Sequence, residues 1–247
     1  MNYNIFGDNM NEIEKLQSFI DESNNIVFFG GAGVSTDSGI KDFRGKNGLY
    51  KDNTLNVPPE YLLSHTCLEK EPELFYDYYR NNMNSLKAKP NITHKYLKKL
   101  EDKNKLKAII TQNIDGLHQV AGSLNVLEIH GTIHKAYCMN CFKDYPGEYI
   151  FNSKGIPKCN CGGIIRPRVV LYEESLPDDF MDAINYIRKA DLLIVAGTSL
   201  TVEPASSLIK YFNGNHLVII NMGDTPYDRY ADLVIQKPLK DIFSKLK

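Results

Sequence analysis

Short apolar segments rich in β-branched residues recur along the chain, separated by polar or helix-like stretches. They lie at residues 26–29, 108–110, 126–129, 169–172, 192–196 and 217–220. Most of them lack an alternation of apolar and polar positions, which is typical of strands buried on both faces of a parallel sheet. Helices are predicted at residues 11–20, 93–100, 178–188 and 203–212. Strands that alternate with helices predict an α/β fold built on a Rossmann-like parallel sheet.

Two segments interrupt this alternation. Residues 41–90 are rich in Tyr, Asn, Pro and charge and contain no strand pattern, and residues 131–167 combine a cysteine cluster with Gly and Pro. We interpret them as two insertions that build a smaller lobe, a helical module plus a zinc ribbon. The Rossmann-like domain is then expected at residues 1–40, 91–130 and 168–247. Open α/β sheets bind ligands at the carboxyl ends of their strands, so the loops after the predicted strands are the candidate sites.

Composition and charge narrow the function classes. The 247 residues are 43% hydrophobic and 24% charged, and 29 Lys and Arg against 30 Asp and Glu give a formal net charge of −1. A balanced charge provides no general attraction to nucleic acid, so a nucleic-acid partner is not expected. No apolar run is long enough to span a membrane, and the chain begins without a basic, apolar leader. We therefore expect a cytoplasmic protein without membrane contact.

A glycine-rich loop, residues 30–35 (GGAGVS), directly follows the first predicted strand. Small residues let a backbone approach a pyrophosphate closely. The loop departs from the G-x-G-x-x-G pattern because Thr36 stands at the third glycine position. By itself it is compatible both with dinucleotide binding and with an ordinary tight turn. Phe43 and Arg44 favour the first interpretation, because they can cover a flat ring and meet phosphate or ribose oxygens.

Four of the five cysteines form two close pairs, C-x₂-C at Cys138 and Cys141 and C-x-C at Cys159 and Cys161. Two such thiolate pairs predict a tetrahedral Zn²⁺ site, and the alternative is a group of unligated buried thiols. Four protein ligands leave no open coordination position, so the zinc is expected to be structural. The second pair is shorter than the commoner C-x₂-C, and the two glycines after it are expected to relieve the strain. Cys67 stands alone and is interpreted as a packed thiol.

Several segments together resemble the sirtuins of bacterial type, which are NAD-dependent protein deacylases. Residues 31–45 (GAGVSTDSGIKDFRG) are similar to the first sirtuin signature and residues 111–118 (TQNIDGLH) to the second. Residues 130–131 (HG) resemble the catalytic pair, and residues 197–199 and Asn221 resemble two later cofactor loops. These matches keep the family's order over nearly the whole chain. They also fall at the ends of predicted strands, where the sheet would bind its ligand.

The resemblance implies an NAD-binding enzyme that transfers the acyl group of an acyl-lysine protein or peptide to ADP-ribose and releases nicotinamide. It implies that Asn113 and Asp115 are catalytic and that His130 is the general base, a role that suits an imidazole. Without the resemblance, a histidine at a strand end, such as His130, is more often structural. The rival base His118 is interpreted as structural because it is expected on the helix that starts after Asp115. The implied cofactor-binding residues are Ala32, Gly33, Ser35, Thr36, Phe43, Arg44, Gln112, Asn113, Ile114, Asp115, His130, Gly197, Thr198, Ser199, Asn221 and Leu239.

The resemblance also implies that residues 169–174 (VVLYEE) pair with the substrate peptide. Val170, Tyr172 and Glu173 are the expected substrate contacts. Backbone pairing of this kind gives affinity with little sequence selectivity. Glu173 stands where sirtuins usually have Gly, and Lys41 stands where they usually have Pro. The first departure affects how the substrate docks, and the second is expected to make the cofactor loop more mobile than in most sirtuins.

The expected acyl group is acetyl or another uncharged one. Sirtuins that prefer succinyl or malonyl lysine carry a Tyr followed three positions later by an Arg. In this chain Tyr79 is followed at that spacing by Asn82, and Arg80 is out of phase with the face that carries Tyr79.

Two other functions remain open from the residues alone. NAD-dependent ADP-ribosylation of a protein needs the same bond cleavage but no acyl-lysine channel. A non-catalytic NAD- or zinc-binding module needs neither. The set of Asn113, Asp115 and His130 argues against such a module.

Overall fold

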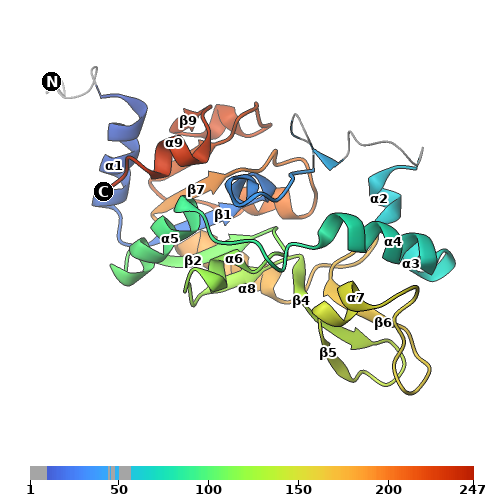
Figure 1. The fold of residues 1–247 in the computed structure, drawn as a ribbon. Coiled ribbons are helices and arrows are strands. Elements are labelled where there is room, and N and C mark those ends of the chain that lie inside the picture. The colour runs from blue at the N-terminus through green and yellow to red at the C-terminus, as the bar shows by residue number, and fades with distance from the viewer. Residues whose placement is uncertain (1–9, 44, 46–47, 50–56) are drawn as a thin grey trace, which may run out of the picture.

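The computed structural model describes residues 10–43, 45, 48–49 and 57–247, and in these residues a six-stranded parallel sheet forms the centre of a larger lobe (Figure 1). Its strands, in spatial order, are β3 (Val126–Glu128), β2 (Leu106–Thr111), β1 (Ile26–Gly30), β7 (Leu192–Ala196), β8 (His216–Ile220) and β9 (Leu233–Ile235). The chain proceeds from β1 toward one edge and, after a crossover, from β7 toward the other. The strand order therefore reverses between β1 and β7.

Helices cover both faces of this sheet because its strands are apolar on both sides. The helices on one face are α1 (Glu12–Glu22), α5 (Ile92–Asp102) and α9 (Leu239–Phe243). Those on the other face are α8 (Asp179–Lys189) and η4 (Ala205–Tyr211), the latter a 3₁₀ helix. Two adjacent residues of β1 show the division: Phe28 packs in the first hydrophobic core and Phe29 in the second, and both are fully buried.

Asn91 begins α5 and ties it to the loop after β1. Its side-chain oxygen accepts a hydrogen bond from the backbone N–H of Thr93, as a helix cap does. Its side-chain nitrogen donates to the carbonyl oxygen of Val34 at 2.8 Å and to the hydroxyl of Ser38 at 3.0 Å. The same residue therefore starts a helix and holds the loop that the sequence marks for cofactor binding.

A smaller lobe combines a second sheet with short helices. Its antiparallel strands, in spatial order, are β5 (Asp144–Pro146), β4 (Gly131–Cys138) and β6 (Ile165–Val169). Its helices are α2 (Pro59–Leu62), α3 (His65–Lys70), α4 (Pro72–Met83) and α7 (Glu148–Asn152). One hydrophobic core joins them, and in it the hydroxyl of Tyr76 donates to the carbonyl oxygen of Ile165 at 2.8 Å. The two insertions expected from the sequence therefore pack together.

The predicted α/β fold, a Rossmann-like sheet with a smaller lobe, is confirmed, but the prediction for residues 169–172 is wrong. Strand β6 ends at Val169 and pairs antiparallel with β4 rather than joining the parallel sheet. The run is apolar because Val169 and Leu171 are buried in the core of the small lobe. Residues 203–212 also differ, since the 3₁₀ helix η4 replaces the predicted α-helix. There the hydroxyl of Ser207 donates to a backbone carbonyl, a contact that competes with regular helix bonds.

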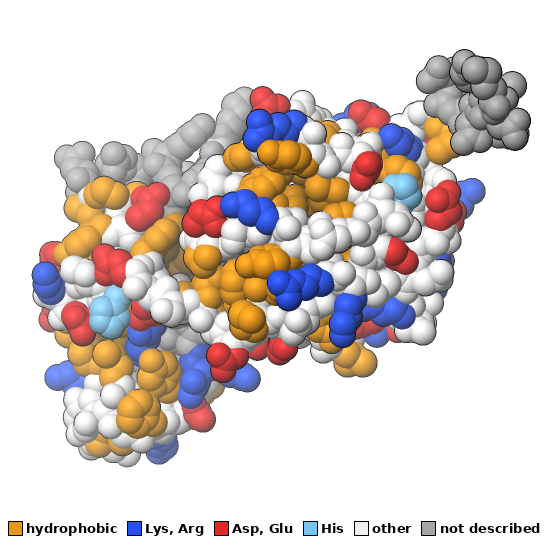
Figure 2. Space-filling view, turned by 180° about the vertical axis from the view of Figure 1, so that it is seen from behind, with side chains coloured by type: hydrophobic (Ala, Val, Ile, Leu, Met, Phe, Trp, Pro, Cys, Tyr) orange, Lys and Arg blue, Asp and Glu red, His pale blue; other side chains and the backbone are white. Residues whose placement is uncertain are grey.

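Acidic and basic side chains are interspersed on one face of the molecule. On the face opposite to the view of Figure 1, Lys and Arg lie among Asp and Glu without a broad field of one sign (Figure 2). Within the described part of the chain, no helix combines the length and the apolar character that a membrane crossing needs.

Candidate active site

A cavity of about 1030 Å³ opens at the carboxyl ends of β1, β2, β7 and β8. Its walls combine the loops after these strands with the end of α4 and residues 169–174. The cavity lies where the strand order reverses between β1 and β7, which is the position at which doubly wound sheets bind their ligands. The topology alone therefore marks this cavity as the candidate site.

Glycines allow the loops after β1 and β7 to approach each other closely. The backbone N–H of Gly33 donates to the carbonyl oxygen of Gly197 at 2.8 Å. A Cβ atom on Gly33 would lie 2.7 Å from the Cα atom of Gly197, a distance that real side chains do not tolerate. The loop continues in two 3₁₀ turns, η1 (Ala32–Val34) and η2 (Thr36–Ser38). Small residues therefore line this part of the cavity, as close contact with a pyrophosphate requires.

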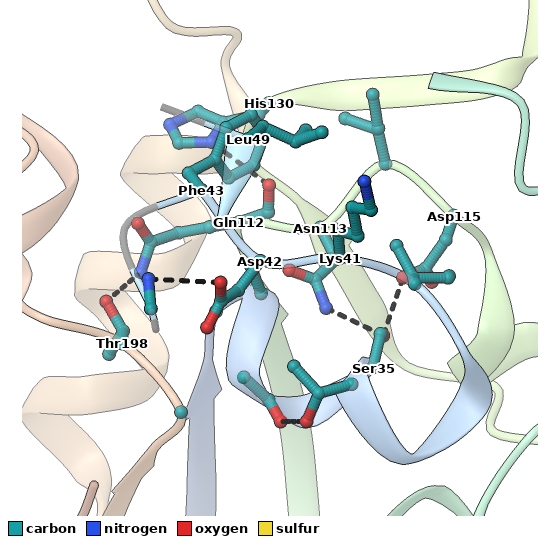
Figure 3. A pocket seen from close by; sticks show the side chains of 18 of the residues that line it. Ser35, Lys41, Asp42, Phe43, Leu49, Gln112, Asn113, Asp115, His130 and Thr198 are labelled. Carbon is teal, nitrogen blue, oxygen red and sulfur yellow. Dashed lines mark hydrogen bonds between the residues drawn. The ribbon is translucent and has the colours of Figure 1, made fainter. Parts of the chain in front are cut away.

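Three buried polar side chains form one hydrogen-bonded cluster in the cavity (Figure 3). The hydroxyl of Ser35 donates to Oδ2 of Asp115 at 2.6 Å, and Nδ2 of Asn113 donates to the same hydroxyl at 3.0 Å. Oδ1 of Asp115 accepts the backbone N–H of Leu117 at 2.9 Å. Both carboxylate oxygens thus accept hydrogen bonds, which fix the orientation of the group. The cluster presents a fixed carboxylate and a fixed amide to a ligand.

A glycine and a histidine hold the backbone on which Asp115 sits. Gly116 has a φ of 70°, a left-handed conformation, and begins α6 (Leu117–Val120). Nε2 of His134 lies 2.8 Å from the carbonyl oxygen of Asp115, and a Cβ atom on Gly116 would lie 2.7 Å from that nitrogen. Glycine is therefore needed here for its conformation and for space.

His130 lies between the end of β3 and the start of β4. Its Nδ1 is 3.1 Å from the carbonyl oxygen of Gln112, which can only accept, so Nδ1 carries the proton and Nε2 is the basic nitrogen. Burial lowers the pKa of His130 below the usual 6.5, and the hydrogen bond to Gln112 partly opposes this effect. Gly131 has a φ of 75°, and a Cβ atom there would lie 2.2 Å from a backbone oxygen of Arg168. The imidazole is therefore neutral at pH 7 and rigidly placed.

Polar side chains after β2, β7 and β8 form hydrogen bonds along the cavity. Nε2 of Gln112 donates to the hydroxyl of Thr198 at 3.0 Å, and the hydroxyls of Ser199 and Thr201 are 2.8 Å apart. Nδ2 of Asn221 donates to the carbonyl oxygen of Gly223 at 2.9 Å. These hydroxyl and amide groups suit the hydroxyl and phosphate oxygens of a nucleotide.

The cavity brings together every described residue that the resemblance implies for cofactor and substrate binding. They are Ala32, Gly33, Ser35, Thr36, Phe43, Gln112, Asn113, Ile114, Asp115, His130, Val170, Tyr172, Glu173, Gly197, Thr198, Ser199, Asn221 and Leu239. Arg44 lies outside the described residues. The individual roles of these residues stay predictions.

Asp42 and Leu49 also line the cavity, although the sequence assigns them no role. Oδ1 of Asp42 accepts the backbone N–H of Gly45 at 3.0 Å, and the carbonyl oxygen of Asp42 accepts the N–H of Leu49 at 2.9 Å. These bonds shape the loop that carries Phe43 along the cavity. Asp42 could have been found because it lies inside the first signature, whereas no sequence signal marks Leu49.

His118 is not part of the cavity lining. It is buried on α6, and its ring lies 4.7 Å from that of His94 on α5. Burial lowers the pKa of His118 to about 3 and that of His94 to about 4. Both rings are therefore neutral at pH 7 and packed, in agreement with a structural role for His118.

The four cysteines of the two pairs gather at one end of the small lobe. Their sulfur atoms all lie within 4.8 Å of one another; Cys138 and Cys161 are 3.5 Å apart, and Cys141 and Cys159 are 3.6 Å apart. Sulfurs on a Zn²⁺ ion at about 2.3 Å each would be separated by about 3.8 Å in a tetrahedron, so the group fits zinc. The hydroxyl of Tyr145 donates to Sγ of Cys159 at 3.0 Å, a supporting contact from outside the ligand set.

The two glycines after the C-x-C pair stand at positions that favour glycine. Gly162 has a φ of 84°, and a Cβ atom on Gly163 would lie 2.7 Å from Sγ of Cys138. Cys67 is fully buried in the core of the small lobe and, among the described residues, belongs to no such group.

A model of the Sir2 family matches residues 31–204, most of the chain and most of the cavity. The chain belongs to the Sir2 family. A Clostridium acetobutylicum protein named NAD-dependent protein deacetylase is 55% identical over 230 residues, which cover 92% of this chain and 94% of that protein. A Staphylococcus aureus protein of the same name is 44% identical over 239 residues, which cover 96% of this chain and 98% of that protein.

Solved Sir2 structures share the fold. A Sir2 complex with a deacetylated p53 peptide and 3′-O-acetyl-ADP-ribose has a TM-score of 0.88 at 38% identity and covers 94% of this chain and 96% of that one. A Sir2 complex with a p53 peptide and NAD⁺ has a TM-score of 0.84, also at 38% identity, with the same coverage of the two chains. The resemblance to the sirtuins is therefore confirmed.

In this Sir2 protein, residues 169–174 are fixed from two sides. The backbone N–H of Tyr172 donates to the carbonyl oxygen of Leu63, and its carbonyl oxygen accepts from the N–H of His65, both at 3.1 Å. The guanidinium of Arg166 holds both carboxylate oxygens of Glu174, at 2.6 and 2.9 Å. Arg166 is buried, and this pairing and the N–H of Leu171 keep the pKa of Glu174 near 2, although burial acts in the opposite direction.

Helix α4 of this Sir2 protein presents no arginine to the cavity. Tyr79 is buried between the rings of Phe75 and Phe151, and Nδ2 of Asn82 donates to a backbone oxygen of its own helix. Arg80 donates to the carbonyl oxygen of Gly155 and to Asp77, and it is not part of the cavity lining. An acidic acyl group would therefore find no cation on this helix.

Proposed function

We propose that this protein uses the cavity to transfer the acyl group of acyl-lysine proteins or peptides to the ADP-ribose part of NAD, with release of nicotinamide. It is an NAD-dependent protein deacetylase of the Sir2 family, like the relatives to which it is 44–55% identical. One observation carries the proposal. The cluster of Ser35, Asn113 and Asp115 and the basic nitrogen of His130 lie in the same cavity, at the point where the strand order reverses.

The proposed work of Asp115 and Asn113 is to hold the nicotinamide end of the co-substrate. A carboxylate accepts hydrogen bonds from a carboxamide NH₂ group, and the amide of Asn113 can bond ribose or an ordered water. Ser35 and Leu117 fix the carboxylate of Asp115, so the carboxylate does not have to change its orientation when the carboxamide binds. A rigid grip of this kind supports displacement of nicotinamide by the acyl oxygen of lysine.

The proposed role of His130 is proton removal. Its Nε2 takes a proton from a ribose hydroxyl, and the resulting oxygen attacks the carbon that came from the acyl group. The Nδ1 bond to Gln112 fixes the tautomer that this step needs. The four cysteines would hold Zn²⁺ as a structural ion, because four protein ligands leave no coordination position for substrate.

The lobe division at 41–90 and 131–167 and the cytoplasmic location remain predictions. The cysteines support the cytoplasmic location. All five are free and four of them form a group suited to a metal ion, which is typical of proteins in a reducing compartment.

The test is an assay with an acetyl-lysine peptide in the presence and absence of NAD. We expect loss of the acetyl group and release of nicotinamide, both dependent on NAD. Mass analysis of the products separates this reaction from ADP-ribosylation, which adds mass to the target. Addition of ADP-ribose without loss of acetyl would contradict the proposed function.

The same assay tests the acyl preference. A succinyl-lysine peptide is expected to react at least about tenfold more slowly than the acetyl peptide, because its carboxylate loses water without gaining a cation from α4. Measurements of kcat/KM on two peptides of identical sequence check this expectation. A faster reaction of the succinyl peptide would contradict it.

The pH dependence follows from the lowered pKa of His130. The reactive form is the neutral imidazole, which stays populated as the pH falls until the pH reaches the lowered pKa. The acidic limb of a kcat/KM profile is therefore expected to have its midpoint below about 6.5, the ordinary histidine value. A midpoint above about 7 would show that burial does not control this group.

A further inference from the structure

Glu173 has a backbone conformation that favours glycine. Its φ is 77°, in the left-handed region, where the Cβ atom of other residues crowds the backbone. Glu173 also lines the cavity, between Tyr172 and Glu174. A strained residue in a wall of the cavity must be held by its surroundings.

The carboxylate of Glu173 supplies such a hold. Its Oε2 accepts the backbone N–H of Thr66 at 3.0 Å and the hydroxyl of Thr66 at 2.7 Å. These bonds, which outweigh the opposing effect of burial, lower the pKa of Glu173, so the carboxylate is ionised at pH 7. Thr66 lies in the first turn of α3, whose leading N–H groups lack partners within the helix. The side chain thus joins residue 173 to α3 by two charge-assisted bonds.

The bond from Glu173 completes the attachment of residues 170–174. Tyr172 is held through its backbone by Leu63 and His65, and Glu174 is held by Arg166. Between these two points, residue 173 is the position where the chain turns through a left-handed conformation. Without the carboxylate, the Cβ atom would favour another conformation, and the backbone groups around it would change direction.

We propose that Glu173 is a positioning residue of this enzyme, whose carboxylate ties the wall at residues 170–174 to α3 and so presents that backbone to the acyl-lysine peptide. This rests on the proposed deacylase function. Glycine would adopt this backbone conformation without strain, whereas Glu173 is held in it by the hydrogen bonds of its carboxylate to Thr66. Loss of these bonds is expected to weaken peptide binding rather than to slow the chemical step, because the carboxylate of Glu173 bonds to Thr66 and not to His130 or Asp115.

Three variants separate the anchor from the conformation. Glu173→Ala removes the carboxylate but keeps the Cβ atom, and we expect the KM for the acetyl-lysine peptide to rise about tenfold, as for the loss of a charged hydrogen bond. Glu173→Gly adopts a φ of 77° without strain, and its peptide KM is expected to return to within about threefold of the parent value. Thr66→Val removes only the hydroxyl donor, and a rise of about threefold is expected.

Steady-state kinetics with both substrates distinguish positioning from general damage. In Glu173→Ala, kcat and the KM for NAD are expected to stay within about twofold, since only a ground-state peptide contact is weakened. Glu73→Ala, which removes an exposed carboxylate from the first turn of α4, is the matched control and should change nothing. Hydrogen exchange should become faster in residues 170–174 of Glu173→Ala and stay unchanged in β7.

An unchanged peptide KM in Glu173→Ala would overturn the proposal, and so would a glycine variant no better than the alanine variant. A parallel loss of kcat and of NAD affinity would also overturn it, because it would indicate a general structural role. A parent enzyme without deacetylase activity would instead overturn the proposed function, so the two failures are distinguishable.

Discussion

His130→Ala is expected to lower kcat/KM for an acetyl-lysine peptide at least about 100-fold, which is the ordinary contribution of a general base. The variant removes Nε2 but keeps the backbone oxygen that accepts the N–H of Val170, so the fold of the site is preserved. Nicotinamide release and mass analysis of the peptide measure the loss. NAD affinity, measured by calorimetry, is expected to change little, because the residues proposed to contact the phosphates and the carboxamide lie elsewhere in the cavity.

His216→Ala is the matched control for this experiment. His216 stacks on Phe19 with ring centroids 3.8 Å apart, and it begins β8, at the end of the strand away from the cavity. Its loss is expected to change kcat/KM by less than about twofold, as for substitutions remote from a site. Near-normal rates in His130→Ala would show that another group is the base.

Loss of zinc is expected to destabilise the small lobe. In Cys159→Ser, one of the four ligands is removed, and the purified protein should contain little zinc. A contribution of the ion of about 4 kcal/mol to the free energy of unfolding, well below the values for zinc-finger peptides, corresponds to a fall in Tm of about 10 °C when the ion is lost. Activity should fall as well, since β4 begins directly after His130 and β6 leads into residues 170–174. Metal analysis, calorimetry and the peptide assay measure the three effects.

Cys67→Ala provides the control for the cysteine substitution. Cys67 is fully buried but lies outside the group of four, so this variant should keep its zinc and most of its activity. A Cys159→Ser protein with unchanged metal content and unchanged Tm would contradict a zinc site formed by these four residues.

The strands of the parallel sheet could be predicted because residues buried on both faces must be apolar at every position. The strand of residues 192–196 is the clearest case, and the structure buries all of it. The same rule gave a wrong prediction for residues 169–172. Leu171 is as deeply buried as a strand residue of the parallel sheet, but it is buried between the short helices and the second sheet of the small lobe. Strand β9 was not predicted, since Leu233–Ile235 is too short for a pattern to emerge. Burial can be inferred from composition, whereas the partner that causes it cannot.

The site was predictable where a motif places a chemical group at the end of a strand. Asp115 and His130 are examples, and the cavity unites them. The contacts that fix them were not predictable, because Ser35 and Asp115 are 80 positions apart in the chain and one sequence carries no distances. Glu173 shows the same limit: the sequence marks a departure from Gly, but only the structure gives its φ and its bond to Thr66.

The hydrogen bond between the N–H of Val170 and the carbonyl oxygen of His130, 2.9 Å long, links the base directly to the substrate-facing wall. Strands β4 and β6 continue this contact, since Gly131 is paired with Val169. On its other side, Nδ1 of His130 bonds to the carbonyl oxygen of Gln112, which follows β2 of the parallel sheet. One short segment, residues 129–131, therefore couples the larger sheet, the base and the substrate-facing wall of the small lobe.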